Sequence, residues 1–152
     1  MIVRLTVDGT ERTADVDPAL SLSALLRDEL GVIAVKNGCE QGECGSCTVW
    51  LDNDIVCACL VPAAQADRST VRTAASRAAD ALDPVQEALL DAGAVQCGYC
   101  IPGFVVTVSD LLEHDPHPSD HALREALTGN ICRCTGYRKI FTAARLAERR
   151  LS

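Results

Sequence analysis

The chain has 152 residues, of which 48% are hydrophobic and 3% aromatic, and its formal net charge at pH 7 is −7. The negative charge argues against nucleic acid as a partner, and no apolar run is long enough to span a membrane. The N-terminus lacks the charged start and apolar run of a signal peptide, so we expect a cytoplasmic protein. In a reducing compartment, nine cysteines favour metal binding over disulfides.

The first half of the chain predicts a small sheet with one covering helix. Asp8 and Gly9 form a strong two-residue hairpin signal between two strand candidates. Ser21 is a helix cap, leucines follow at helical spacing, and Gly31 marks the end of that helix. The strands are expected at residues 2–7, 11–16, 47–51, 54–60 and 69–73.

The second half predicts four helices joined by short loops. Asp83 and Pro84 begin the first helix, and Gln86 completes a capping-box pattern. The other three helices are expected near Pro102–Leu112, Ser119–Leu127 and Ile140–Leu151.

Between the two halves, residues 63–83 are small and polar apart from one short strand candidate. This change in composition predicts a domain boundary near residues 74–82. We therefore expect one domain of mixed strands and helix at residues 1–76 and an all-helical domain at residues 77–152. Each has room for only a modest core, and small domains often need a metal or a disulfide for stability.

The first cysteine group has the spacing of a plant-type [2Fe–2S] site. The segment CEQGECGSC, residues 39–47, gives C-x4-C-x2-C, and Cys59 follows as a fourth thiol. Glycines let a loop wrap closely around a cluster, and they occur here at Gly38, Gly42 and Gly45. Structural zinc sites usually pair two C-x2-C knuckles, so zinc fits this loop poorly.

A fifth cysteine, Cys57, leaves the fourth ligand of this group open. It lies on the same predicted strand as Cys59, two residues earlier, so both side chains point to the same face. Cys57 could therefore compete with Cys59 for the metal. We expect Cys57 to be a small buried side chain, which is common for free cysteine.

The second cysteine group consists of Cys97 and Cys100, before the helix at Pro102, and Cys132 and Cys134, before the last helix. Helix N-termini favour an anion, such as a thiolate-bound cluster. Arg133 adds a cation here, or is an ordinary solvated charge. The spacing alone leaves zinc open, because C-x2-C is also a zinc knuckle.

Three motifs carry a resemblance to a known family. The segments GCEQGECGSCTV (38–49), QCGYCIPGF (96–104) and GNICRCTGYRKI (129–140) resemble the iron–sulfur subunit of the molybdenum hydroxylases, the xanthine dehydrogenase family. The similarity covers about residues 2–149. It implies an α+β fold, in which a ferredoxin-like β-grasp domain precedes a four-helix bundle and each holds one [2Fe–2S] cluster.

The resemblance also implies the roles of individual residues. The first cluster is held by Cys39, Cys44, Cys47 and Cys59, and the second by Cys97, Cys100, Cys132 and Cys134. Cys59 is preferred to Cys57 because an apolar residue such as Leu60 follows the ligand in the family. Gln96 matches a glutamine near the pterin of the partner subunit, and Cys134 matches the ligand whose sulfur is closest to that pterin. Gly98 is expected in the loop of the second cluster.

The implied function is electron transfer from a molybdenum–pterin centre on a large subunit to FAD on a medium subunit or to another acceptor. The chain itself is expected to hold neither cofactor and no catalytic residue. We expect the substrate of the complex to be a purine, with other N-heterocycles and aldehydes as alternatives. A free-standing two-cluster ferredoxin and a structural or regulatory metal-binding module are the rival classes.

The remaining candidates receive ordinary structural interpretations. His114, His117 and His121 are expected on a solvated surface loop between helices. Trp50 and Phe104 are expected to pack in the interior, or to anchor an interface where exposed. The chain contains no Gly-rich phosphate-binding loop and no nucleophile–base pattern.

Overall fold

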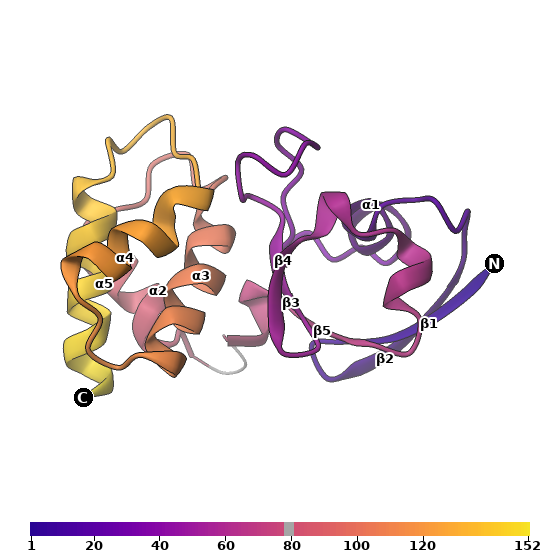
Figure 1. Ribbon diagram of the computed structural model, residues 1–152, viewed down its shortest axis with the longest axis horizontal. Coiled ribbons are helices and arrows are strands. Elements are labelled where there is room, and N and C mark those ends of the chain that lie inside the picture. Colours follow the sequence, from indigo (N-terminus) through magenta and orange to yellow (C-terminus); the bar gives the residue numbers. More distant parts are fainter. Residues whose placement is uncertain (78–80) are drawn as a thin grey trace.

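The computed structural model describes residues 1–77 and 81–152, which form a sheet-containing half and a helical half lying side by side (Figure 1). The strands are β1 (Ile2–Val7), β2 (Thr10–Asp15), β3 (Thr48–Leu51), β4 (Asp54–Cys57) and β5 (Thr70–Arg72). The helices are α1 (Leu22–Ala24), α2 (Pro84–Asp91), α3 (Ile101–His114), α4 (Asp120–Ala126) and α5 (Arg138–Leu151). The prediction of an α+β fold is confirmed.

The five strands form one mixed sheet in the order β2-β1-β5-β3-β4. β1 and β2 are antiparallel and joined at Asp8 and Gly9, whose φ angles of 47° and 79° confirm the predicted hairpin turn. In β1 the alternate side chains of Val3, Leu5 and Val7 are buried. β5 pairs parallel to β1 and antiparallel to β3, so it joins the two hairpins into one sheet.

One face of the sheet is covered by α1 and the π-helical turn that continues it, Leu25–Glu29. The Ser21 hydroxyl accepts a hydrogen bond from the Ala24 N–H at 3.2 Å, as expected of an N-cap. Leu22, Leu25 and Leu26 are fully buried. This packing gives the first half its own apolar core.

The strand predicted over residues 54–60 is wrong in its second part. β4 ends at Cys57, and a 3₁₀ turn, Ala58–Leu60, follows. The chain leaves the sheet here because fully buried Ala58 packs into the core beneath α1, and the Val61 carbonyl accepts the Leu22 N–H at 2.7 Å. Strand alternation therefore does not place Cys57 and Cys59 on one face.

The helical half packs α2, α3, α4 and α5 around a second core. The predicted capping box of α2 is confirmed, since Asp83 accepts from the Gln86 N–H at 2.8 Å and Gln86 accepts from the Asp83 N–H at 3.2 Å. α3 is the central helix, with eight buried residues. α4 ends at Ala126 and passes into a 3₁₀ turn, Leu127–Gly129, so the third predicted helix is one residue too long.

The two halves meet where α3 packs against β3 (Figure 1). Trp50 belongs to β3, yet it is fully buried in the core of the helical half, and its Nε1–H donates to Asp110 at 2.9 Å. The Arg72 guanidinium lies 4.6 Å from the centre of the indole ring. Trp50 and Phe104 are thus packing residues, as predicted.

The connection between the halves is held by charged side chains. The Arg77 guanidinium bonds to Asp83 at 2.6 Å and to Glu113 at 2.5 Å. The predicted boundary near residues 74–82 includes residues 78–80, which lie outside the described residues.

Candidate metal centres

The first cysteine group forms a loop that directs backbone N–H groups at one sulfur. Gln41, Glu43 and Cys44 each donate to the Sγ of Cys39 at 3.4 Å. The backbone hydrogen bonds from Gln41 and Cys44 lower the pKa of Cys39 to about 7. Because the thiolate is the form that binds metal, the loop prepares Cys39 as a ligand.

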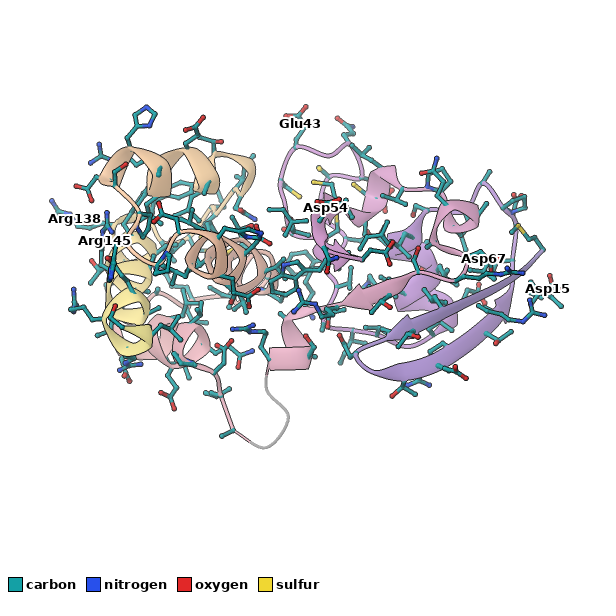
Figure 2. The ribbon with its side chains drawn as sticks, turned by 60° about the horizontal axis from the view of Figure 1, so that its bottom comes forward. Asp15, Glu43, Asp54, Asp67, Arg138 and Arg145 are labelled. Atoms are coloured by element: carbon teal, nitrogen blue, oxygen red, sulfur yellow. The ribbon has the colours of Figure 1, made fainter. Side chains whose placement is uncertain are left out.

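Glycines allow the backbone of this loop to pass close to the sulfurs. A Cβ on Gly38 would lie 2.8 Å from the Sγ of Cys44. Gly42 has a φ of 76°, and a Cβ there would collide with the side chain of Leu60. Several yellow sulfur atoms lie beneath the loop that carries Glu43 (Figure 2).

The structure brings both remaining candidates, Cys57 and Cys59, to this loop. Burial raises the pKa of Cys47 to about 12, and the neighbouring Cys59 and Cys57 thiols contribute to that rise. Burial and the neighbouring thiols, Cys59 first, also raise the pKa of Cys57, whose Sγ donates to the Gly42 carbonyl at 3.7 Å. Cys57 is half-buried against the first core rather than enclosed in it. The choice of Cys59 as the fourth ligand stays a prediction.

The second cysteine group comes from two loops that are distant in sequence. Cys97 and Cys100 precede α3, and Cys132 and Cys134 lie between α4 and α5. The Sγ atoms of Cys97 and Cys134 are 3.6 Å apart and both residues are exposed. Cys100 and Cys132 are buried, and burial together with a hydrogen bond to Cys132 raises the pKa of Cys100 to about 12. The thiols therefore form an outer pair and an inner pair.

Thr135 supplies the donors of the second site. Its hydroxyl and its N–H donate to the Sγ of Cys132 at 3.1 and 3.4 Å. Burial opposes them, but these hydrogen bonds leave the pKa of Cys132 lowered. The cysteine motifs gave no role to Thr135, although a hydroxyl three residues after a candidate ligand is a usable signal.

The prediction that both pairs lie at helix N-termini is only half right. Cys100 is the N-cap of α3. Cys134 instead stands four residues before α5, because Gly136 and Tyr137 both have positive φ angles and turn the chain before the helix begins. The Tyr137 hydroxyl accepts the Cys132 N–H at 3.0 Å and fixes this loop. Arg133 is exposed.

Gln96 and Gly98 belong to the loop before α3. The side chain of Gln96 is exposed, and among residues 1–77 and 81–152 it has no hydrogen-bond partner. Gly98 has a φ of 82°, which turns the chain between Cys97 and Cys100. Tyr99 reaches from this loop to the first site, where its hydroxyl donates to the Asn37 carbonyl at 2.5 Å.

The two sites are joined directly through the backbone. The Ile131 N–H donates to the Cys44 carbonyl at 2.9 Å. The Asn130 side chain donates to the Gly45 carbonyl at 3.3 Å. Gly103 faces the same carbonyl so closely that a Cβ would collide with it. Nothing in the cysteine spacing pointed to this join.

The arrangement of the thiols is compatible with a two-iron cluster at each site. A [2Fe–2S] cluster binds four thiolates on two irons, which matches an outer and an inner pair at the second site. At the first site the N–H donors and the glycine-lined loop match an anionic cluster.

The prediction of three loop histidines holds only for His117, because His114 is the last residue of α3 and His121 lies in α4. His114, His117 and His121 are exposed, and their nearest carboxylates are Asp110, Glu148 and Glu125 at 3.4–3.7 Å.

Among the described residues, no helix has the length and apolar character needed to cross a membrane.

Both halves match families defined by the same kind of cofactor. Residues 5–75 match the family described as a 2Fe-2S iron-sulfur cluster binding domain, and residues 70–145 match a [2Fe-2S] binding domain family. The fold and the two thiol sites therefore define an iron–sulfur protein.

Similar proteins narrow the class of iron–sulfur protein to which the chain belongs. The chain is 44% identical over 149 residues to the nicotinate dehydrogenase small FeS subunit of Eubacterium barkeri, covering 97% of this chain and 95% of that protein. It is 42% identical to the nicotine 6-hydroxylase small subunit of Paenarthrobacter nicotinovorans, over 93% of this chain and 86% of that protein. It is 38% identical to a probable xanthine dehydrogenase subunit of Bacillus subtilis (strain 168), over 98% and 86%. The chain belongs to the iron–sulfur subunits of the molybdenum hydroxylase family, which confirms the resemblance found in its sequence.

Solved structures agree with this assignment. The aldehyde oxidoreductase of Desulfovibrio desulfuricans ATCC 27774 superposes with a TM-score of 0.93 at 39% identity, covering 99% of this chain and 17% of that one. Quinoline 2-oxidoreductase of Pseudomonas putida 86 superposes with a TM-score of 0.90 at 35% identity, over 98% of this chain and 96% of the matched chain. The fold thus occurs both as a separate chain of similar size and within a much longer one.

Proposed function

We propose that this chain is the electron-transfer subunit of a heteromeric molybdenum hydroxylase. It relays electrons from the molybdenum–pterin centre of a large subunit to FAD on a medium subunit or to another acceptor. A β-grasp domain at residues 1–76 and a four-helix bundle at residues 77–152 each hold one [2Fe–2S] cluster. Two separate apolar cores and two successive family matches support this division.

The residues proposed to hold the clusters are those predicted from the sequence. The first set is Cys39, Cys44, Cys47 and Cys59, and the second set is Cys97, Cys100, Cys132 and Cys134. Bound clusters of this type accept and release single electrons. The protein contributes sulfur ligands, N–H and hydroxyl donors that stabilise added negative charge, and burial of the inner thiols away from water.

The observation that carries the proposal is the hydrogen bond from the Ile131 N–H to the Cys44 carbonyl, at 2.9 Å. Cys44 is a proposed ligand of the first cluster, and Ile131 directly precedes Cys132, a proposed ligand of the second. One hydrogen bond and a few covalent bonds therefore connect the two ligand sets. Beside this contact, the Asn130 side chain donates a second hydrogen bond to the Gly45 carbonyl.

We propose that Gln96 and Cys134 face the pterin of the large subunit. Gln96 is exposed and has no partner for its carboxamide within the described residues, although a carboxamide can both donate and accept hydrogen bonds. Cys134 belongs to the exposed outer pair next to it, and exposed Tyr99 and Ile131 lie nearby in the same two loops. These four exposed residues can contact a partner subunit at the second cysteine site.

The proposed substrate of the complex is an N-heterocycle, with a purine as the first candidate. One relative is named for xanthine, whereas two with higher identity are named for nicotinate and nicotine. The similarity to an aldehyde oxidoreductase keeps aldehydes as an alternative. The substrate would bind on the large subunit, and we place the complex in the cytoplasm.

The test is to purify the native complex through this chain and measure its composition. We expect about four iron and four sulfide per chain, together with molybdenum and a larger subunit. The clusters should become reduced in a single turnover when substrate is added without oxygen. Zinc in place of half of the iron would contradict the assignment of a [2Fe–2S] cluster to the second cysteine group. Elution of the loaded chain as a monomer that carries no molybdenum would favour a free-standing carrier.

Replacing Gln96 by Ala tests the pterin contact within the same complex. Both cluster spectra should stay unchanged, while molybdenum occupancy falls or the clusters are reduced more slowly by substrate. Unchanged molybdenum content together with an unchanged reduction rate would leave Gln96 without this role.

A further inference from the structure

The charge of the chain is distributed unevenly. Residues 124–152, all described by the structure, contain seven Lys and Arg side chains but only two acidic ones, so they carry a net charge of +5 within a chain of net charge −7. Figure 2 shows Arg138 and Arg145 at one end of the molecule and Asp15 and Asp67 at the other. The C-terminal segment is thus locally basic within an acidic protein, although Arg145 and Arg150 form ion pairs with neighbouring carboxylates.

Four of these seven cations line a cleft of about 580 Å³ between α4 and α5. These four are arginines, and the rest of the lining mixes apolar and aromatic side chains with Asp120 and Thr142. The arginines are Arg124, Arg138, Arg145 and Arg149. The other lining side chains include Leu123, Tyr137 and Phe141, of which Tyr137 and Phe141 are partly exposed.

Arg145, one arginine of the cleft, already binds two carboxylates of the same chain. Arg145 bonds to Asp120 at 2.5 Å and to Glu148 at 2.7 Å. Arg124, Arg138 and Arg149 have no ion pair with any other described residue. The guanidinium group binds carboxylates through two parallel hydrogen bonds, so three such groups remain available to acidic side chains.

The size of the cleft argues against a small anion. Arg138 and Arg149 lie eleven residues apart on α5, which corresponds to about 16 Å along the helix axis. A single phosphate cannot bridge that distance, whereas an extended peptide covers it with about five residues. The strong negative charge of the rest of the chain disfavours nucleic acid.

The cleft adjoins the second cysteine site. Gly136 and Tyr137 line it, and the Tyr137 hydroxyl holds the loop of Cys132 through the 3.0 Å hydrogen bond. A partner protein that approaches this site therefore lies within reach of the cleft. We propose that the cleft between α4 and α5 docks an acidic segment of the molybdenum-binding subunit, an inference that rests on the proposed function.

The test compares two charge-reversed variants of equal net charge, each cluster-loaded and mixed with the rest of the purified complex. Arg138→Glu/Arg149→Glu changes the cleft. Arg4→Glu/Arg12→Glu changes two exposed arginines of β1 and β2 in the other half. We expect the cleft variant to raise the Kd for the molybdenum-binding subunit at least tenfold and to weaken its dependence on salt. The control should match the wild type.

Cluster spectra and melting temperature identify a variant that fails to fold. A second variant, Arg138→Lys/Arg149→Lys, keeps the charge and places amines in the cleft for zero-length carbodiimide cross-linking. We expect the cross-linked peptide to be an acidic segment of the molybdenum-binding subunit. Cross-links to the flavin subunit alone, or to no partner at all, would overturn the inference.

The remaining outcomes separate this inference from the proposed function. If the wild-type chain binds no molybdenum-containing subunit, the proposed function itself fails. If the wild type and the cleft variant assemble equally well, only the docking inference fails. Loss of binding to inorganic phosphate or duplex DNA in the cleft variant, with unchanged assembly, would show that the cleft serves an anion or nucleic acid instead.

Discussion

The two cysteine sites of this protein are built in different ways. The first gathers three candidate ligands from the nine-residue segment 39–47, and its own backbone supplies the hydrogen bonds to sulfur. The second draws two cysteines from each of two loops, and the packing of the helices brings these loops together. The first site thus depends mainly on local backbone conformation, whereas the second depends on the helical core.

The sites also differ in which cysteine sulfur accepts the hydrogen bonds. In the first, three N–H groups reach Cys39, which is partly exposed. In the second, one side chain, Thr135, serves the buried Cys132. A single substitution can therefore remove the side-chain donor of the second site, whereas the first is sensitive to changes in loop conformation.

The largest expected effect tests the ligand set of the first site. We predict that Cys59→Ala removes the first cluster, with a loss of about two of four irons, because three thiolates leave one iron incompletely bound. Cys57→Ala is the matched control and should keep both clusters. Visible and paramagnetic resonance spectra with iron analysis would measure this. Loss of the first cluster in Cys57→Ala, with retention in Cys59→Ala, would shift the ligand register by two residues.

The next effect tests the contact between the sites. Gly45 has a φ of 66°, and a Cβ there would collide with the Gly129 carbonyl. We predict that Gly45→Ala destabilises the protein by about 3–5 kcal/mol, from backbone strain and overpacking together. Gly31→Ala shares the positive φ but meets no atom within 4 Å, and should cost only about 1–2 kcal/mol. Thermal unfolding would compare them, and equal losses would show that the contact contributes nothing beyond the strain.

A smaller effect concerns the donor of the second site. Thr135→Val removes the hydroxyl that donates to Cys132 at 3.1 Å. The reduced cluster carries more negative charge, so losing this donor should lower the midpoint potential of the second cluster by about 50 mV. Thr135→Ser keeps the hydroxyl and should stay near the wild type. Redox titration would resolve the two clusters, and a shift confined to the first one would contradict the assignment.

The smallest effect concerns the ion pairs that support the helical half. Hydrogen bonds from Arg145 hold the pKa values of Glu148 and Asp120 below their ordinary values of 4.5 and 3.8. A carboxyl group whose pKa is lower in the folded than in the unfolded protein stabilises the fold at pH values above the unfolded pKa. This stabilisation is lost as the pH falls through the folded pKa. Arg145→Gln should therefore slightly lower the melting temperature at pH 7, and the difference should shrink as the pH falls below about 4. Arg149→Gln should show no such pH dependence.

The sequence alone predicted features that depend on neighbouring residues. The Asp8–Gly9 turn needs only two residues that tolerate positive φ, and the capping box of Asp83 and Gln86 needs only a spacing of three. The cysteine motif at residues 39–47 is local in the same sense. Backbone geometry and short-range hydrogen bonds fix each of these, so the sequence contains the information directly.

Tertiary structure alone decided what depends on distant contacts. β5 lies between β1 and β3, and β4 stops at Cys57 because the following turn packs beneath α1. The hydrogen bond from Ile131 to Cys44 and the burial of Trp50 in the opposite core arise only when the two halves meet. The cleft beside α5 needs the packed positions of two helices. Such features result from how separate segments fill one shared space, which no local pattern in the chain specifies.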